Sequence, residues 1–219
     1  MQNRQIIEPK RSIDVIHETD VLVVGSGPGG LSAAIASARC GVKTTLLERF
    51  GCFGGNITVV GVEGFAWYRH EKTVEAGGIG REFEELAKEM GAAVPESQSL
   101  SYELDSEGFK LVADKLVMDT GIHPMLHRSF SMPIMEGNTI IGVIVESKAG
   151  REAILSKVVI DATGDADVAF RAGAQLNTMP VEELMATSVM FHLAGVDKKA
   201  FLSEIQNNPQ SYKDWSDSE

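Results

Sequence analysis

The most constraining feature of this chain is a glycine-rich segment that lies between two apolar stretches. Residues 21–30 read VLVVGSGPGG, and a second apolar stretch over residues 42–47 ends at Glu48. This order predicts a β-strand, a tight turn, an α-helix and a second strand that ends in a carboxylate. The same arrangement is typical of the phosphate-binding βαβ unit of dinucleotide-binding proteins.

Each glycine of the G-x-G-x-x-G pattern has a separate physical purpose. Gly25 permits the sharp turn out of the strand, Gly27 lets the main chain approach a pyrophosphate, and Gly30 lets the helix pack closely on the sheet. The pyrophosphate would meet a helix N-terminus, where free N–H groups and the helix dipole favour an anion. Glu48 could accept the hydroxyls of an adenosine ribose and would repel a 2′-phosphate, so NADP is disfavoured.

A G-x-G-x-x-G pattern by itself is weak evidence, because glycine-rich turns also occur in ordinary strand-to-helix connections. In this chain an apolar strand precedes the glycines, and small apolar residues follow them with helical spacing, namely Leu31, Ala34, Ile35 and Ala38. The acid then closes a second apolar stretch. We therefore favour a dinucleotide-binding turn over an ordinary connection.

The composition is that of a globular protein, with 219 residues of which 43% are hydrophobic and 23% charged. The net charge of −11 argues against a nucleic-acid or anionic-membrane surface, which would need a basic patch. No stretch approaches the roughly 18 apolar residues of a membrane span, and the polar N-terminus lacks a signal-peptide pattern. We therefore expect a cytoplasmic protein. Its two cysteines are too few for a disulfide framework or an iron–sulfur cluster.

Two further helices are expected in the middle of the chain. Apolar residues recur with helical spacing over residues 79–90 and again over residues 109–117. Gly91 and Gly121 follow these stretches, as is typical of helix ends. Residues 95–105 are polar and are expected to form a connector.

After Gly121 the apolar residues recur at every second position, which is the spacing of β-strands. Residues 124–132, 139–146 and 153–160 alternate as three β-strands joined by tight turns, and a short helix is expected over residues 198–206. The predicted fold class is therefore α/β, a Rossmann-like parallel sheet with a three-stranded β-meander.

Four segments in this order carry a resemblance to a known family. They are residues 7–20 before the first strand, residues 25–30 with Glu48, the sequence GCFGGN at 51–56, and the sequence VIDATGDAD at 159–167. Together they resemble the FAD-dependent oxidoreductases with a glutathione-reductase-like flavin domain, related to the flavoprotein subunit of heterodisulfide reductase. The resemblance covers nearly the whole chain and implies FAD as cofactor.

The resemblance also implies which residues bind FAD. They are Gly25, Gly27, Pro28, Gly29, Gly30, Glu48, Arg49, Gly54, Gly55, Asn56, Phe130, Thr163, Gly164 and Asp165. By this resemblance the glycine turn holds the pyrophosphate, Glu48 holds the adenosine ribose with Arg49 close behind, and residues 54–56 pass beside the ribityl chain and isoalloxazine. The strand near Phe130 offers backbone groups to the adenine, and residues 163–165 close over the phosphates.

The implied domain organisation has three parts. Residues 1–18 form an N-terminal arm, residues 19–174 a FAD-binding domain with a helical insert at about 79–121, and residues 175–219 the start of a substrate domain or a partner-contacting tail. The family normally returns with a late Gly-Asp segment that completes the flavin site, and nothing after Asp165 fits it. We therefore expect an incomplete site, completed by a missing C-terminal half or by a second polypeptide. A homo-oligomer is also expected as an alternative.

Catalytic residues are not assigned by the sequence. Arg69 and His70 follow the flavin-side glycine segment and combine an anion clamp with a titratable group, although a solvated turn anchored by two aromatic residues is the favoured interpretation. Cys52 lacks a second cysteine nearby for a dithiol mechanism, and a packed turn residue is the simpler interpretation. The histidines lack metal-ligand spacing, so no metal is expected.

The favoured function is a FAD-dependent oxidoreductase that moves a hydride or electron pair between a small organic substrate and a second acceptor. The alternative is a non-catalytic FAD-holding or assembly subunit that another chain completes. An NAD-dependent dehydrogenase would fit Glu48, but it does not need the meander followed by the A-T-G turn at residues 162–164.

Overall fold

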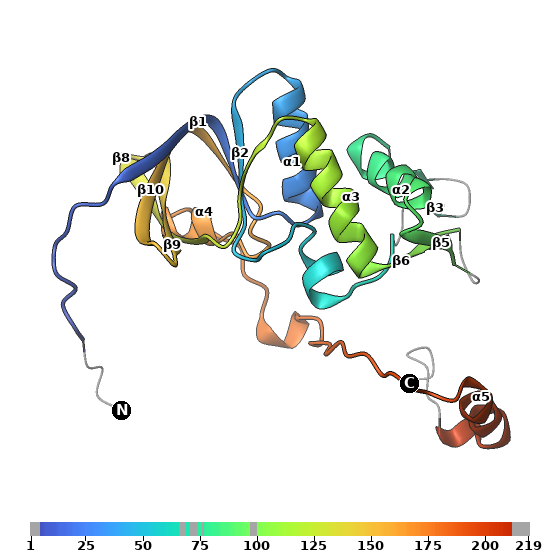
Figure 1. Ribbon diagram of the computed structural model, residues 1–219. Helices are drawn as coiled ribbons and strands as arrows, with labels where there is room; N and C mark the ends of the chain where they lie inside the picture. The colour runs from blue at the N-terminus through green and yellow to red at the C-terminus, as the bar shows by residue number, and fades with distance from the viewer. Residues whose placement is uncertain (1–4, 66–68, 71–73, 76, 97–99, 212–219) are drawn as a thin grey trace. The chain divides into compact units, whose positions relative to one another are not determined.

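The computed structural model describes residues 5–65, 69–70, 74–75, 77–96 and 100–211 (Figure 1). It divides into two compact units, residues 1–185 and residues 186–219, and each is described by itself. Within these described ranges, no helix combines the length and apolar character that a bilayer crossing requires.

A six-stranded mixed sheet forms the centre of the first unit. Its strands, in spatial order, are β7 (His123–Met125), β2 (Thr44–Leu47), β1 (Val15–Val24), β10 (Gly150–Asp161), β9 (Thr139–Ser147) and β8 (Ser129–Glu136). The first four strands run parallel, whereas β10, β9 and β8 pair antiparallel as a meander. The predicted α/β class, a Rossmann-like parallel sheet with a three-stranded meander, is confirmed.

Helices cover one face of the parallel strands. They are α1 (Pro28–Arg39), α2 (Ile79–Glu89) and α3 (Ser106–Asp119), which lie side by side in Figure 1. Their buried residues join Val23 of β1 and Leu46 of β2 in one hydrophobic cluster. Their neighbours Leu22 and Leu47 belong to a second cluster with the meander and the short α4 (Asp167–Arg171), because successive strand residues point to opposite faces.

The ends of the two middle helices have local causes. The carboxylate of Asp105 accepts a hydrogen bond from the Glu107 N–H and so caps the start of α3. Gly91 after α2 and Gly121 after α3 have φ angles of 73° and 72°, a left-handed conformation that glycine adopts without strain. Both helices therefore end where the sequence predicts.

Three strand predictions differ from the structure. β1 begins at Val15, within the segment expected to precede the first strand, because its first residues pair with β10. The single strand expected over 124–132 is two strands, β7 and β8, separated by His127 with a φ of 54°. The expected polar connector over residues 95–105 contains β6 (Tyr102–Leu104), which pairs antiparallel with β5 (Ala93–Pro95).

The remaining elements are short. β3 (Arg69–His70) and β4 (Val74–Glu75) pair antiparallel, η1 (Asn56–Val60) is a single π-helical turn, and η2 (Val181–Glu183) is a 3₁₀ turn. The second unit contains α5 (Lys198–Asn207), capped by the Asp197 carboxylate, and the 3₁₀ turn η3 (Pro209–Ser211).

Candidate cofactor site

The candidate site lies where the four parallel strands end. The carboxyl ends of β1, β2, β7 and β10 lie at one edge of the sheet, because all four run in the same direction. Residues 25–30, Glu48, residues 126–128 and residues 162–165 follow these strands in turn. In open α/β sheets this edge is where ligands bind.

The turn between β1 and α1 is shaped by glycines that differ in their surroundings. A Cβ atom on Gly25 would overlap the carbonyl oxygen of Ala162, and one on Gly30 would overlap the carbonyl oxygen of Gly25. These two glycines therefore let α1 and β10 pack closely around the turn. In contrast, a Cβ atom on Gly27 or Gly29 would meet no atom within 4 Å, so their main chain borders open space.

The N-terminus of α1 faces this edge with its own N–H groups uncapped by side chains. Pro28 occupies the first turn, Gly27 makes no side-chain capping bond, and no acidic residue lies in the first turn. The free N–H groups and the positive end of the helix dipole favour an anion at this point.

Glu48 is held firmly beside the same turn. It is 6% exposed, and its Oε2 accepts hydrogen bonds from the Ser26 N–H at 2.9 Å and from the Ser26 hydroxyl at 2.6 Å. Its Oε1 accepts a third from the Phe50 N–H at 2.9 Å. The carboxylate is thus fixed next to the glycine turn rather than turned to solvent.

The segment 51–56 crosses directly over the glycine turn. The Gly54 N–H donates to the Ser26 carbonyl at 2.9 Å, and a Cβ atom on Gly55 would lie 2.7 Å from the Gly27 Cα. Gly54 and Gly55 have φ angles of 116° and 58°, so a side chain at either would be strained. Asn56, which is exposed, begins η1 at the end of this crossing.

Asp161 organises the fourth strand end, and sequence reasoning did not single it out. Its Oδ1 accepts from the Thr163 N–H and hydroxyl at 3.1 and 2.8 Å, and its Oδ2 accepts from the Ala169 N–H at 2.9 Å. The Thr163 hydroxyl also accepts from the Asp167 N–H. This network holds the A-T-G turn in place, with Gly164 and Asp165 exposed. Its sequence signal is the carboxylate that directly precedes the turn.

Two other implied FAD ligands have protein partners. The Arg49 guanidinium lies 4.7 Å from the centre of the Phe50 ring, a cation–π contact. Phe130 pairs with Val145 across β8 and β9 and packs against the second hydrophobic cluster. The Arg128 N–H donates to the Glu48 carbonyl at 3.0 Å, which joins the start of β8 to the carboxylate's own backbone.

The candidate catalytic residues belong to separate segments of the chain. Arg69 and His70 form the backbone of β3, and their side chains lie outside the described residues, as do residues 66–68. Cys52 is half-buried, with its thiol 3.8 Å from the Thr58 hydroxyl. No group of three or more potential metal ligands occurs in the described part of the chain.

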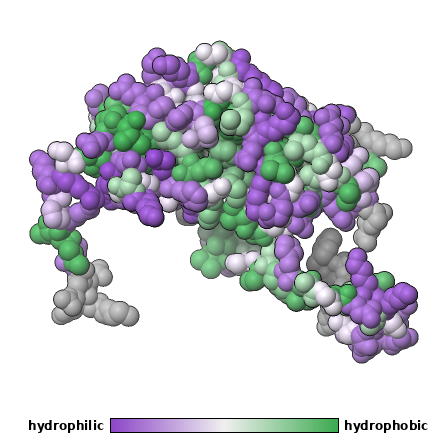
Figure 2. Space-filling model, viewed as in Figure 1, coloured by the Kyte–Doolittle hydropathy of each residue, from purple (hydrophilic) through white to green (hydrophobic). Residues whose placement is uncertain are grey.

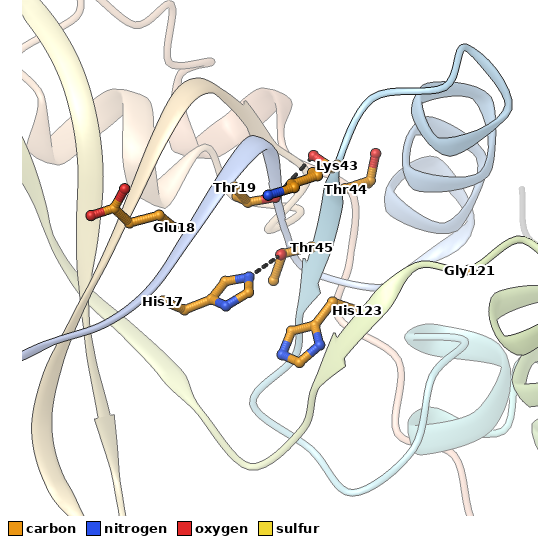
Figure 3. Close-up of a pocket in the computed structure, with 8 residues that line it drawn as sticks. All are labelled: His17, Glu18, Thr19, Lys43, Thr44, Thr45, Gly121 and His123. Atoms are coloured by element: carbon orange, nitrogen blue, oxygen red, sulfur yellow. Dashed lines mark hydrogen bonds between the residues drawn. The ribbon is translucent and has the colours of Figure 1, made fainter.

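A pocket of about 240 Å³ lies near the opposite, amino ends of the parallel strands. Two of its histidines, His17 and His123, stack with ring centres 4.5 Å apart (Figure 3). The His17 Nε2 lies 2.9 Å from the Thr45 hydroxyl. Burial lowers the pKa of His17, and the nearby His123 and Lys43 lower this pKa further.

Comparison with known proteins identifies the family. Residues 20–218 match the family described as FAD dependent oxidoreductase. The chain belongs to this family. The match over residues 20–218 establishes the family, whereas the individual FAD-binding residues remain predictions.

This chain matches only part of the length of each named relative. The thiamine thiazole synthase of Metallosphaera sedula is 33% identical over 160 residues, which are 68% of this chain and 55% of that protein. The enzyme of the same name from Saccharolobus solfataricus is 33% identical over 162 residues, 69% of this chain and 57% of that protein. The chain thus spans about half the length of the curated relatives it matches.

Solved structures support the fold. A geranylgeranyl bacteriochlorophyll reductase-like protein from Thermoplasma acidophilum has a TM-score of 0.53 at 22% identity, covering 73% of this chain and 43% of that one. The THI4 structure from Thermovibrio ammonificans has a TM-score of 0.50 at 22% identity, covering 70% of this chain and 61% of that one. At these identities the likeness concerns the fold alone.

Proposed function

We propose that this FAD-dependent oxidoreductase family member binds the adenosine diphosphate half of FAD at the carboxyl edge of its parallel strands. The observation that carries the proposal is the open main chain at Gly27 and Gly29 beside a buried carboxylate, Glu48. A pyrophosphate against the N–H groups of the α1 N-terminus and a ribose at the acid fit this arrangement. FAD, when bound, supplies the ability to accept and release a hydride or an electron pair.

The chain's own residues would bind and orient the cofactor. The α1 N-terminus holds negative charge without a lysine, and the Gly54–Gly55 crossing keeps side chains away from the phosphate turn. The Asp161 network fixes the exposed turn at Gly164 and Asp165 on the other side. The substrate would be a small organic molecule, with a second molecule as electron acceptor.

A second candidate function is a FAD-holding subunit that another polypeptide completes. Its support is the segment after α4, where large apolar side chains are exposed to solvent, including Val181 at 83% and Met185 at 95%. Figure 2 shows apolar surface on the chain that follows α4. Large exposed apolar surface is typical of interaction sites. The occupant would be a second polypeptide, the remaining part of a longer chain, or another copy in a homo-oligomer.

The absorption spectrum of the purified chain tests the proposal. We expect FAD added to the chain to remain bound through gel filtration, with a flavin spectrum that bleaches when a reductant is added. Gly27→Val should remain folded and lose the flavin, because the new side chain fills the open space at the phosphate turn. Equal flavin retention by both proteins would reject this binding site.

Turnover separates the two candidate functions. If a small acceptor reoxidises the reduced flavin when no other polypeptide is present, the chain is an oxidoreductase that is active by itself. Flavin that exchanges electrons only after a second polypeptide is added supports the FAD-holding subunit.

A further inference from the structure

Glu48 has one free acceptor site, whereas an adenosine ribose offers two hydroxyl donors. A carboxylate has about four lone-pair sites, two on each oxygen. The Ser26 N–H and hydroxyl fill both sites of Oε2, and the Phe50 N–H fills one site of Oε1. One site on Oε1 is left for a ligand.

The Ser26 hydroxyl cannot easily leave the carboxylate. Ser26 is 0% exposed, so its hydroxyl has no access to water as an alternative partner. The 2.6 Å O–H···O⁻ bond is of the short, charge-assisted kind, which is stronger than a neutral hydrogen bond. The Gly54 N–H holds the Ser26 carbonyl at 2.9 Å, which fixes the backbone of the turn. A ribose hydroxyl that displaced the serine would leave a buried hydroxyl unpaired.

We propose that Ser26 is a specificity-determining residue that restricts Glu48 to one of the two ribose hydroxyls. This inference rests on the proposed function, because it requires the ribose of an ADP-containing cofactor to lie at Glu48. The serine hydroxyl remains hydrogen-bonded to Oε2, so only Oε1 can accept a hydrogen bond from the cofactor ribose.

Binding of ADP, 2′-deoxy-ADP and 3′-deoxy-ADP to the wild-type chain tests the inference by calorimetry. We expect one deoxy analogue to bind within about twofold of ADP, because the hydroxyl that it lacks makes no contact with Glu48. The other should bind about tenfold more weakly, since it loses a hydrogen bond to a charged group.

Ser26→Ala sharpens the test, because it removes the hydroxyl and keeps the backbone N–H. Oε2 then has a free site, so both deoxy analogues should bind about tenfold more weakly than ADP. Ser37→Ala is the matched control. Ser37 lies in α1, which follows the glycine turn, but it is away from Glu48, so this variant should keep the wild-type pattern. Glu48→Ala should abolish the discrimination between the three ligands.

The outcomes separate the two proposals. Equal weakening of both deoxy analogues with the wild-type chain would overturn the role of Ser26 while leaving the ADP site intact. An unchanged pattern in Ser26→Ala would overturn it as well. No binding of ADP itself would overturn the proposed function, and this inference with it. If Ser26→Ala fails to fold, the wild-type comparison still decides, because it needs no variant.

Discussion

The two ends of the parallel strands are built from different chemistry. At the carboxyl edge the open surface is main chain, because Gly27 and Gly29 carry no side chain and the acid beside them is held in place by three N–H and hydroxyl donors. Near the amino ends the pocket is lined by polar side chains, including the stacked His17 and His123 (Figure 3). The first region can select a ligand by close approach, and the second holds a titratable side chain, His17, whose pKa is lowered by burial.

The difference teaches which substitutions each region tolerates. At the carboxyl edge an added methyl group either overlaps backbone or fills the space proposed for the cofactor. Near the amino ends a change of side chain alters charge and stacking without blocking the proposed cofactor site. Substitutions at the carboxyl edge should therefore affect cofactor binding, or stability where they overlap backbone, whereas substitutions near the amino ends should leave cofactor binding unchanged.

The largest effect is expected from a matched pair of glycine substitutions. Gly30→Ala places a methyl group against the Gly25 carbonyl oxygen, a backbone overlap that no side-chain rotation relieves. We expect it to lower the free energy of unfolding by about 3 kcal/mol. Gly27→Ala meets no atom within 4 Å and should cost less than about 1 kcal/mol. Urea unfolding of both variants measures the difference, and equal losses would contradict the packing role of Gly30.

Glu48→Ala should have the next largest effect, on binding. Loss of a charged acceptor for the ribose should weaken ADP binding by about 2 kcal/mol. His123→Ala, in the amino-end pocket, is the control and should bind ADP like the wild type. Calorimetric titration of both variants measures the contrast. Equal binding by Glu48→Ala and the wild-type chain would remove the carboxylate from the proposed site.

Local sequence signals predicted the parts of the fold that depend on neighbouring residues. The glycine spacing at residues 25–30 predicted the strand–turn–helix unit, because turn geometry and helix packing act over a few residues. Gly91 and Gly121 likewise marked the ends of α2 and α3 through their positive φ angles. The three strands of the meander were also detected, although the first was joined to β7.

Features that depend on distant pairing were not predicted. The start of β1 at Val15 depends on β10, which lies far along the chain. The stacking of His17 on His123 arises because β1 and β7 both flank β2 in the sheet. The division of β7 from β8 at His127 requires a left-handed residue that is uncommon outside glycine, so no simple pattern signals it.

The sequence predicted which residues form the candidate site, but it did not predict the hydrogen bonds between them. The sequence placed Glu48 beside the glycine turn, yet it did not indicate that Ser26 occupies one of its oxygens. It drew attention to residues 163–165 but not to the Asp161 carboxylate that holds them. Ser26 and Glu48 lie 22 residues apart and meet only after folding, whereas the Asp161 carboxylate directly precedes the turn that it holds.

The pH dependence of stability sharpens the contrast between the two regions. The pKa of His17 is lowered in the folded chain by burial first, then by His123 and Lys43. Between this lowered pKa and the unfolded value of about 6.5, the unfolded chain binds more protons, so stability rises with pH. The stabilisation is complete above about pH 6.5 and is lost as the pH falls through the lowered pKa.

Comparison of the wild-type chain with His17→Gln measures this dependence. We expect the urea midpoint of the wild type to fall more between pH 7.5 and 5.5 than that of the variant, since the other titrating groups are shared. The charged groups around the pair are Lys43 and Glu18 of the pocket, and the Asp20–Lys157 ion pair beyond it. Parallel pH profiles for the two proteins would contradict a titrating His17.

The smallest effect is expected from the surface ion pair between α1 and α2. Arg39 donates to both oxygens of Glu82 at 2.8 and 2.6 Å, and the two side chains are 44% and 43% exposed. Solvent screening and the entropy of ordering two long side chains offset most of the attraction, so Arg39→Ala should cost at most about 1 kcal/mol. It should leave ADP binding unchanged, because Arg39 lies at the end of α1 that is remote from the glycine turn. Urea unfolding at low and high salt measures the loss, which should shrink as salt is added. A salt-independent loss larger than that of Gly30→Ala would mean that the packing of the arginine's stem, rather than its charge, joins the two helices.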